Sequence, residues 1–206
     1  MTNNPNNTIQ QAMEALQGKD SQARAEAITI LGELQYEPAL EIMIDLVDTV
    51  DPGTRYIIVQ ALGRIPDARA VPALLKALRW DDIFTRAAAT GALIQIGEPA
   101  LDGLVTALRD QNKAVRRASA KAIGKIGITT DNAITGLSVA LLDVDNSVRR
   151  FAAEALGRLG DKNMVPELAE VLDDRDPKAR IAAFRALAKI DTPEARQAVR
   201  AWVKRD

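Results

Sequence analysis

One short motif recurs six times along the chain of 206 residues, and this repetition restricts the possible folds more than any other feature. Each copy centres on an arginine, and successive arginines are 30 to 33 residues apart. An aspartate or asparagine stands four residues before each arginine, and a leucine or isoleucine stands seven residues after it. The six arginines are Arg24, Arg55, Arg86, Arg116, Arg149 and Arg180. A chain of this kind is expected to fold by stacking copies of one unit.

Each unit has the pattern of two helices joined by a turn. In "AVPALLKAL" (70–78) and "TRAAATGALIQI" (85–96), apolar residues recur at the spacing of a helix with one buried face. The residue four before the arginine is a good N-cap for the second helix, because its side chain can accept hydrogen bonds from unpaired amides. These caps are Asp20, Asp51, Asp82, Asn112, Asp145 and Asp176. We expect each arginine to bridge the turn of its own repeat to the next repeat.

Glycines recur at two places in the units. Four stand late in second helices, where a missing side chain would let neighbouring helices approach closely. They are Gly32, Gly63, Gly124 and Gly157. Three others, Gly97, Gly127 and Gly160, suit the left-handed conformation just past a helix end.

The repeats predict an all-α fold, an α-solenoid of about six helical hairpins with a C-terminal capping helix. We expect one domain over residues 1–206, with Trp202 of the last helix turned inward. The predicted repeats are 8–35, 37–66, 68–97, 98–127, 131–160 and 164–191, and the terminal helix is 192–203.

Composition excludes many kinds of site. The chain contains no cysteine and no histidine, so disulfides, thiolate nucleophiles and imidazole chemistry are absent. The sequence shows no nucleophile–base pair, no glycine-rich phosphate loop and no metal-binding cluster, so we assign no catalytic residue. No stretch approaches the roughly 18 apolar residues of a membrane span. We therefore expect a cytoplasmic protein.

Charge is unevenly distributed along the chain. The formal net charge is −1, but residues 1–102 carry −6 and residues 103–206 carry +5. Such a molecule could orient a charged partner. Its overall balance is not the basic balance of a general nucleic-acid-binding protein, so we do not expect a nucleic-acid partner.

The motif D-x-x-x-R-x-x-A-x-x-A-L-G-x-[IL]-G, complete from Asp145 to Gly160, resembles the HEAT-like repeats named after phycobilin lyases. The resemblance covers residues 8 to 203. It implies a right-handed solenoid in the manner of HEAT and armadillo proteins, with first helices outside and second helices lining a concave face.

Function is expected at variable positions of the second helices, one, two, five and nine residues after each repeat arginine. The third repeat breaks the pattern most, because it carries Trp80, Ile83 and Phe84 where its neighbours are polar. This apolar cluster is either local packing or a binding surface. We name as candidate binding residues the cluster, its expected neighbours and a basic flank with its aromatic residue. They are Tyr56, Ile57, Trp80, Ile83, Phe84, Arg117, Lys121, Arg150 and Phe151.

The family resemblance implies a cyanobacterial phycobilin lyase subunit or a bilin carrier. Such a protein would hold a linear tetrapyrrole such as phycocyanobilin, without a covalent bond, and present it to a cysteine of a phycobiliprotein. Arg117, Lys121 or Arg150 would pair with the two propionates. A second HEAT-like lyase subunit is an expected partner. The alternative is a non-catalytic scaffold or adaptor that binds a protein in its groove, as in phycobilisome assembly or degradation. Whether the chain is an enzyme stays open.

Overall fold

The computed structural model describes residues 5–204, and these form thirteen α-helices and four short 3-10 helices with no β-strand among them. The predicted all-α fold is confirmed. The chain divides into two compact units, of which unit 1 ends at Ile96 and unit 2 begins at Gly97. The single continuous domain over residues 1–206 therefore stays a prediction, and each unit is described by itself.

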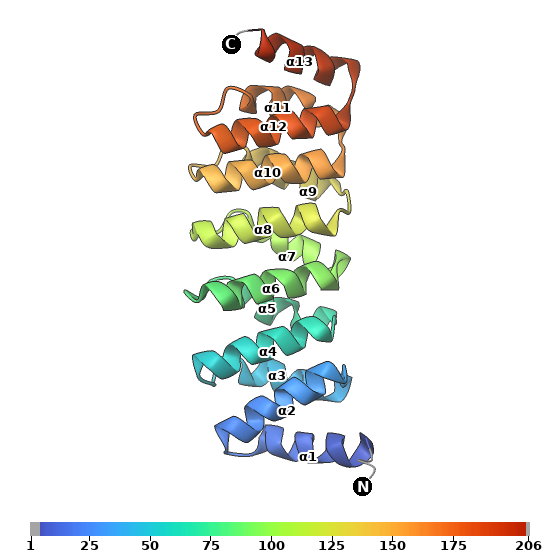
Figure 1. The fold of residues 1–206 in the computed structure, drawn as a ribbon, viewed down its shortest axis with the longest axis vertical. Coiled ribbons are helices and arrows are strands. Elements are labelled where there is room, and N and C mark those ends of the chain that lie inside the picture. The colour runs from blue at the N-terminus through green and yellow to red at the C-terminus, as the bar shows by residue number, and fades with distance from the viewer. Residues whose placement is uncertain (1–4, 205–206) are drawn as a thin grey trace. The chain divides into compact units, whose positions relative to one another are not determined.

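Unit 1 consists of three helical hairpins. Their first helices are α1 (Pro5–Gln17), α3 (Leu40–Leu46) and α5 (Val71–Ala77). Their second helices are α2 (Ser21–Glu33), α4 (Pro52–Arg64) and α6 (Ile83–Ile96). The 3-10 turns Glu37–Ala39 and Ala68–Ala70 lead into α3 and α5. The second helices α2, α4 and α6 follow one another in a row, with α3 and α5 behind them in Figure 1.

Unit 2 repeats this arrangement with three hairpins and a final helix. Its first helices are α7 (Leu101–Ala107), α9 (Asp131–Ala140) and α11 (Val165–Val171). Its second helices are α8 (Lys113–Ile126), α10 (Asn146–Leu159) and α12 (Pro177–Ile190). The 3-10 turns Glu98–Ala100 and Lys162–Met164 precede α7 and α11, and α13 (Pro193–Val203) ends the fold. Within unit 2, α10 contacts both α8 and α12, and these three helices form its second-helix layer (Figure 1).

The predicted N-caps are confirmed at all six second helices. Asp145 accepts hydrogen bonds from the amides of Ser147 and Val148, at 3.0 and 3.1 Å. Asp20, Asp51, Asp82, Asn112 and Asp176 accept equivalent bonds from amides in the first turns of their helices. These bonds satisfy donors that a helix leaves unpaired at its beginning.

Close approach at the repeat glycines is also confirmed. A Cβ atom built on Gly157 would lie 2.6 Å from Cα of Ala186, and one on Gly124 would lie 2.7 Å from Cα of Ala155. No methyl group fits at such distances without moving the backbone of the next helix. The paired glycines and alanines therefore hold α8, α10 and α12 close together.

Two of the three terminal glycines adopt the expected conformation. Gly127 and Gly160 are left-handed, with φ of 73° and 72°. Gly97 also has positive φ, 76°, but its ψ of −130° places it outside the left-handed helical region. The residue leads directly into a 3-10 turn rather than closing α6, so the prediction for Gly97 is wrong.

The terminal helix packs onto the last hairpin, as the sequence predicts. The ring of Trp202 lies 6.1 Å from the ring of Phe184 on α12, measured between centroids. Helix α13 contacts both α11 and α12. It covers apolar surface that the last repeat would otherwise expose, which is the usual role of a terminal cap in repeat proteins.

The close approach of α10 and α12 predicts an unusual response to a glycine-to-alanine change. Gly157→Ala should lower the free energy of unfolding by about 1–3 kcal/mol, because the added methyl group overpacks the helix contact. Gly91→Ala is the matched control, since nothing lies within 4 Å of a Cβ atom at Gly91 in the middle of α6. That change should stabilise the protein by about 0.5–1 kcal/mol. Urea denaturation measures both, and a stabilising Gly157→Ala would contradict the close contact.

Candidate functional site

Every repeat arginine holds the turn that precedes its own helix. Nε of Arg55 donates to the carbonyl oxygen of Val47 at 3.1 Å, and its Nη2 donates to that of Val50 at 3.3 Å. Nη1 of Arg149 donates to the carbonyl oxygens of Asp143 and Val144, at 2.8 and 3.3 Å. Arg24, Arg86, Arg116 and Arg180 make equivalent bonds in their own repeats. These carbonyls lie in the last turn of a helix or follow its end, where a helix leaves carbonyls without partners.

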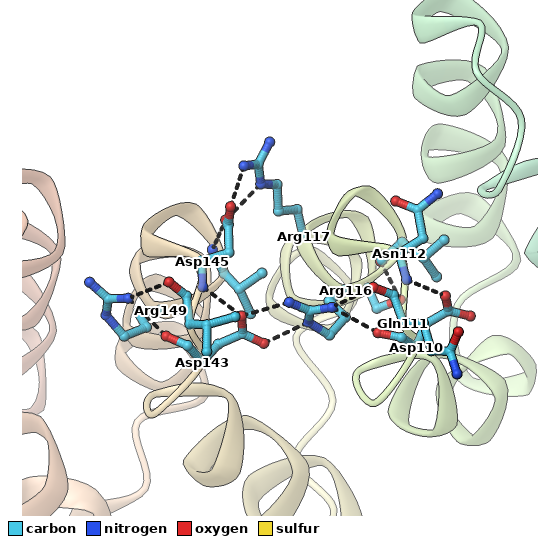
Figure 2. Close-up of polar contacts among 12 residues, drawn as sticks. Asp110, Gln111, Asn112, Arg116, Arg117, Asp143, Asp145 and Arg149 are labelled. Carbon is cyan, nitrogen blue, oxygen red and sulfur yellow. Dashed lines mark hydrogen bonds and ion pairs between the residues drawn. The ribbon is translucent and has the colours of Figure 1, made fainter.

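Two of these arginines in unit 2 also bridge to the next repeat. Nε and Nη2 of Arg116 contact the carboxylate of Asp143 at 2.6 and 2.8 Å, and Arg149 contacts Asp174 at the same two distances. The four side chains are no more than 12% exposed. Figure 2 shows Arg116 between the turn at 110–111 and Asp143. Hydrogen bonds from Arg149 lower the pKa of Asp174 below its ordinary value.

The expectation that every arginine bridges two repeats is wrong, and the position two residues before the cap explains why. In the two bridges of unit 2, this position of the next repeat holds Asp143 or Asp174. In unit 1 the same position holds Thr49 in the repeat after Arg24 and Trp80 in the repeat after Arg55. Arg24 bonds only to carbonyls of its own repeat in the described part of the chain. The guanidinium carbon of Arg55 instead lies 4.5 Å from the centroid of the Trp80 ring. A cation–π contact therefore takes the place of the ion pair.

The predicted apolar cluster of unit 1 divides into packed and open residues. Trp80 is half-buried against Arg55, so local packing accounts for it. Ile83 and Phe84, in the first turn of α6, are 65% and 69% exposed. Tyr56 and Ile57 are half-buried on α4, and the Tyr56 hydroxyl accepts a hydrogen bond from Nε2 of Gln60 at 2.7 Å. A binding role for these residues stays a prediction.

The basic residues predicted in unit 2 differ in how far their charge is already offset. Arg117 forms two hydrogen bonds with the carboxylate of Asp145, one of them from Nε at 2.7 Å, and they lower the pKa of Asp145 to about 2. The guanidinium carbon of Arg150 lies 4.4 Å from the centroid of the Phe151 ring. Nε of Arg150 is 4.0 Å from Oε1 of Glu154. Lys121 is exposed and forms no ion pair in the described part of the chain.

Four further cations join Lys121 on the second-helix layer of unit 2. All five are exposed, and none forms an ion pair with a described residue. We call them the basic face: Lys121 and Lys125 on α8, Arg158 on α10, and Arg185 and Lys189 on α12. They stand five or nine residues after a repeat arginine. Applying that spacing to the sixth repeat would have identified Arg185 and Lys189, which the sequence analysis did not select.

The basic face surrounds two hollows with floors of small residues. A hollow of 50 Å³ includes Lys121, Lys125 and Phe151 in its lining, and a larger one of 410 Å³ includes Arg185 and Lys189. Arg158 lines both. Their floors are made by the closely packed Ala120, Gly124, Ala155, Gly157, Ala182 and Ala186. An extended ligand with an apolar body and carboxylates would find contact surface and charge partners here.

The described residues contain no cluster of acidic side chains that could hold a metal ion. No described helix has the length and apolar composition needed to cross a membrane. Besides cations and small apolar residues, the hollows of the basic face are lined by Phe151 and by one acidic residue, Glu154 of α10.

Comparisons with known proteins agree with the repeat architecture. The family model described as HEAT repeats matches residues 9–94, 72–143 and 134–206. Phycocyanobilin lyase subunit alpha of Microchaete diplosiphon is 34% identical over 90 residues, which are 39% of this chain and 31% of that protein. Phycocyanobilin lyase subunit beta of Pseudanabaena tenuis (strain PCC 7409) is 35% identical over 121 residues, 56% of this chain and 42% of that protein. The chain thus spans less than half the length of these relatives.

A solved structure points in the same direction. The complex of CpcE and CpcF of phycocyanin lyase from Nostoc sp. PCC7120 matches with a TM-score of 0.60 and 27% identity. The match covers 68% of this chain and 89% of that chain. The fold and a moderate sequence similarity are therefore shared with lyase subunits of this kind.

The contact between Arg55 and Trp80 predicts that an aspartate at position 80 can partly replace the tryptophan as the partner of Arg55. Trp80→Ala should lower the free energy of unfolding by about 1–3 kcal/mol, through lost packing and a lost cation–π contact. Trp80→Asp should lose less, because a carboxylate here would meet Arg55 as Asp174 meets Arg149. Urea denaturation measures both variants, alone and combined with Arg55→Ala. If both Trp80 variants lost the same free energy of unfolding, the cation–π contact and the ion pair would not be equivalent bridges.

The pKa of Asp145 predicts a pH dependence that Arg117 controls. An aspartate with a folded pKa of about 2 and an ordinary value near 3.9 contributes stability above about pH 4, and this contribution is lost as the pH falls towards 2. In Arg117→Gln the folded pKa should rise towards the ordinary value. The variant should therefore be less stable than the wild type at pH 6, with a smaller deficit at pH 2.5.

Urea denaturation at the two pH values measures this difference. The matched control is Lys113→Gln, which removes one exposed charge from the same helix. Its difference in stability from the wild type should stay the same at pH 6 and pH 2.5. A deficit of Arg117→Gln that is independent of pH would contradict the coupling of Arg117 to Asp145.

Proposed function

The chain belongs to the HEAT-repeat family, and we propose that it is a bilin-binding subunit of a phycobilin lyase. In this proposal the second-helix layer of unit 2 holds a linear tetrapyrrole for transfer to a phycobiliprotein. The similarity to phycocyanobilin lyase subunits supports the class of ligand. The observation that carries the proposal is the basic face, whose cations form no ion pair with a described residue and surround hollows floored by alanine and glycine.

The chemistry of the ligand fits this surface better than it fits the residues first predicted. A linear tetrapyrrole has an extended conjugated body and two propionates, so it needs apolar contact along its length and separated cations. Small floor residues allow close contact with flat rings, and Phe151 adds an aromatic side. Arg117 is already bound to Asp145, so binding a propionate would cost it that ion pair. Lys121 and the other cations of the basic face carry no such cost.

Unit 1 contributes differently in this proposal. Its exposed Ile83 and Phe84 would contact a protein partner, either the phycobiliprotein or a second HEAT-like lyase subunit. The chain has no cysteine, so the thiol that receives the bilin would come from the acceptor. Half-buried Tyr56 and Ile57 would support this contact from α4.

A protein-binding scaffold is the second candidate function. The observation that favours it is the exposure of Ile83 and Phe84, since neighbouring large apolar residues on a surface often mark a protein-binding site. A scaffold would need the partner contact of unit 1 but no bilin on unit 2.

Bilin titration tests the proposed function. Purified protein is titrated with phycocyanobilin while its visible absorbance is recorded, and saturable binding is expected. The triple variant Lys125→Gln, Arg158→Gln and Lys189→Gln should bind at least about tenfold more weakly, because charge-assisted hydrogen bonds contribute about 1.5–3 kcal/mol each. Salt should weaken binding to the wild type more than binding to this variant.

The control removes the same charge elsewhere. Lys113→Gln, Lys162→Gln and Lys178→Gln together neutralise three exposed lysines of unit 2 outside the basic face. This variant should bind phycocyanobilin as the wild type does. Equal weakening by both triple variants would show a general charge effect, and absence of any spectral change would favour the scaffold.

A further inference from the structure

A further hollow of unit 2 lies between α9 and α11 and has a volume of 610 Å³. Its lining comes from the end of α9, from α11, from the turns that follow these two helices and from Arg149 of α10. It shares no residue with the hollows of the basic face. Nothing in the proposed bilin-binding function uses it.

Two aliphatic side chains at this hollow face solvent. Leu142 and Val144 are each 80% exposed, more than any other large apolar residues of the described chain. The position of Leu142, three residues before the cap, holds Asp48, Arg79, Arg109 or Asp173 in four other repeats. Among these five repeats, only this one carries an apolar residue at the position. Buried Leu141 and Val171 extend the apolar surface into the hollow.

Helix α11 contributes two acidic residues to the lining of the hollow. Glu167 and Glu170 stand one turn apart on α11, and neither forms an ion pair with a described residue. Oε2 of Glu167 is shielded from solvent and accepts no hydrogen bond from the described residues. An unsatisfied carboxylate oxygen is costly. Since the last torsion of a glutamate has a broad energy minimum, a small rotation can present this oxygen to a donor in the hollow.

The arginines at the hollow do not neutralise these glutamates. Arg149 makes both of its carboxylate contacts with Asp174, and its side chain is 6% exposed. Nη2 of Arg175 donates to the carbonyl oxygen of Val144 at 3.1 Å. A surface with an aliphatic side and an unpaired acidic side is complementary to a segment that carries an aliphatic residue beside a cation.

We propose that this hollow is a docking site for a segment of another protein that inserts an aliphatic side chain beside Leu142 and Val144. A lysine or arginine of the same segment contacts Glu167 and Glu170. The aliphatic residue supplies buried area, and the cation supplies orientation. The site is independent of the proposed bilin function, because a protein that bound no bilin would still carry it.

Synthetic helical peptides test this docking site on the full chain. The probe is a fluorescent 16-residue alanine–glutamine peptide with two leucines one turn apart, followed one turn later by a lysine. Two matched peptides replace the lysine with glutamate or the leucines with alanine. Fluorescence anisotropy should show binding of the leucine–lysine peptide at least tenfold tighter than binding of either matched peptide.

Two variants of the protein locate the site. Glu167→Gln with Glu170→Gln should bring the affinities for the lysine and glutamate peptides within twofold of each other. Leu142→Ser with Val144→Ser should weaken binding of the leucine–lysine peptide at least tenfold. Glu98→Gln with Asp102→Asn is the matched control, since it removes two exposed acidic groups of unit 2 elsewhere and should change neither affinity.

Three results would overturn the proposal. The first is equal affinity of the wild type for the lysine and glutamate peptides, a comparison that needs no variant to fold. The second is an unchanged preference for lysine in the Glu167 and Glu170 variant. The third is a concentration-dependent dimer of the wild type that Leu142→Ser with Val144→Ser disperses, because a second copy of the chain would then occupy the surface.

Discussion

The bond between each repeat arginine and the carbonyls of its own turn is the interaction on which the other contacts depend. A helix leaves its last carbonyls without partners, and a planar guanidinium can satisfy two of them at once. Arg55 and Arg149 do so with distances of 2.8 to 3.3 Å. With the turn fixed, the capping aspartate is in place to begin the second helix, and the remaining face of the guanidinium is available to the next repeat.

The sequence predicts the parts of the structure that a periodic spacing determines. Caps such as Asp145 and close contacts such as Gly157 with Ala186 follow from the repeat, because every hairpin meets the same local requirement. It does not determine the partner of a side chain that spans two repeats. Trp80 breaks the repeat as a residue of a binding site would, yet it lies against Arg55. Arg117 has the position of a groove cation, yet Asp145 binds it while also capping α10.

The cations of unit 2 fall into two groups that differ in burial and in their partners. Those near the turns, such as half-buried Arg116 and buried Arg149, are satisfied by aspartates. Those further along the helices, such as Arg158 and Lys189, point to solvent and have no acidic partner among the described residues. The first group holds the hairpins together, whereas the second leaves a positive surface over a small-residue floor. Charge at this surface is therefore available to a ligand without loss of an internal ion pair.

Asp143 has a further consequence for how the protein opens. Its carboxylate receives Arg116 from the preceding repeat and also accepts the amide of Asp145, which begins the cap of its own repeat (Figure 2). Asp174 has the same two roles with Arg149 and Asp176. Fraying of one hairpin in unit 2 therefore removes a hydrogen bond from its neighbour. Adjacent hairpins are thus expected to open in one cooperative event. Backbone amides of α8, α10 and α12 should then exchange with deuterium together. In unit 1, Thr49 offers no such shared carboxylate to Arg24 and Trp80 offers none to Arg55, so α2 and α4 can exchange independently of each other.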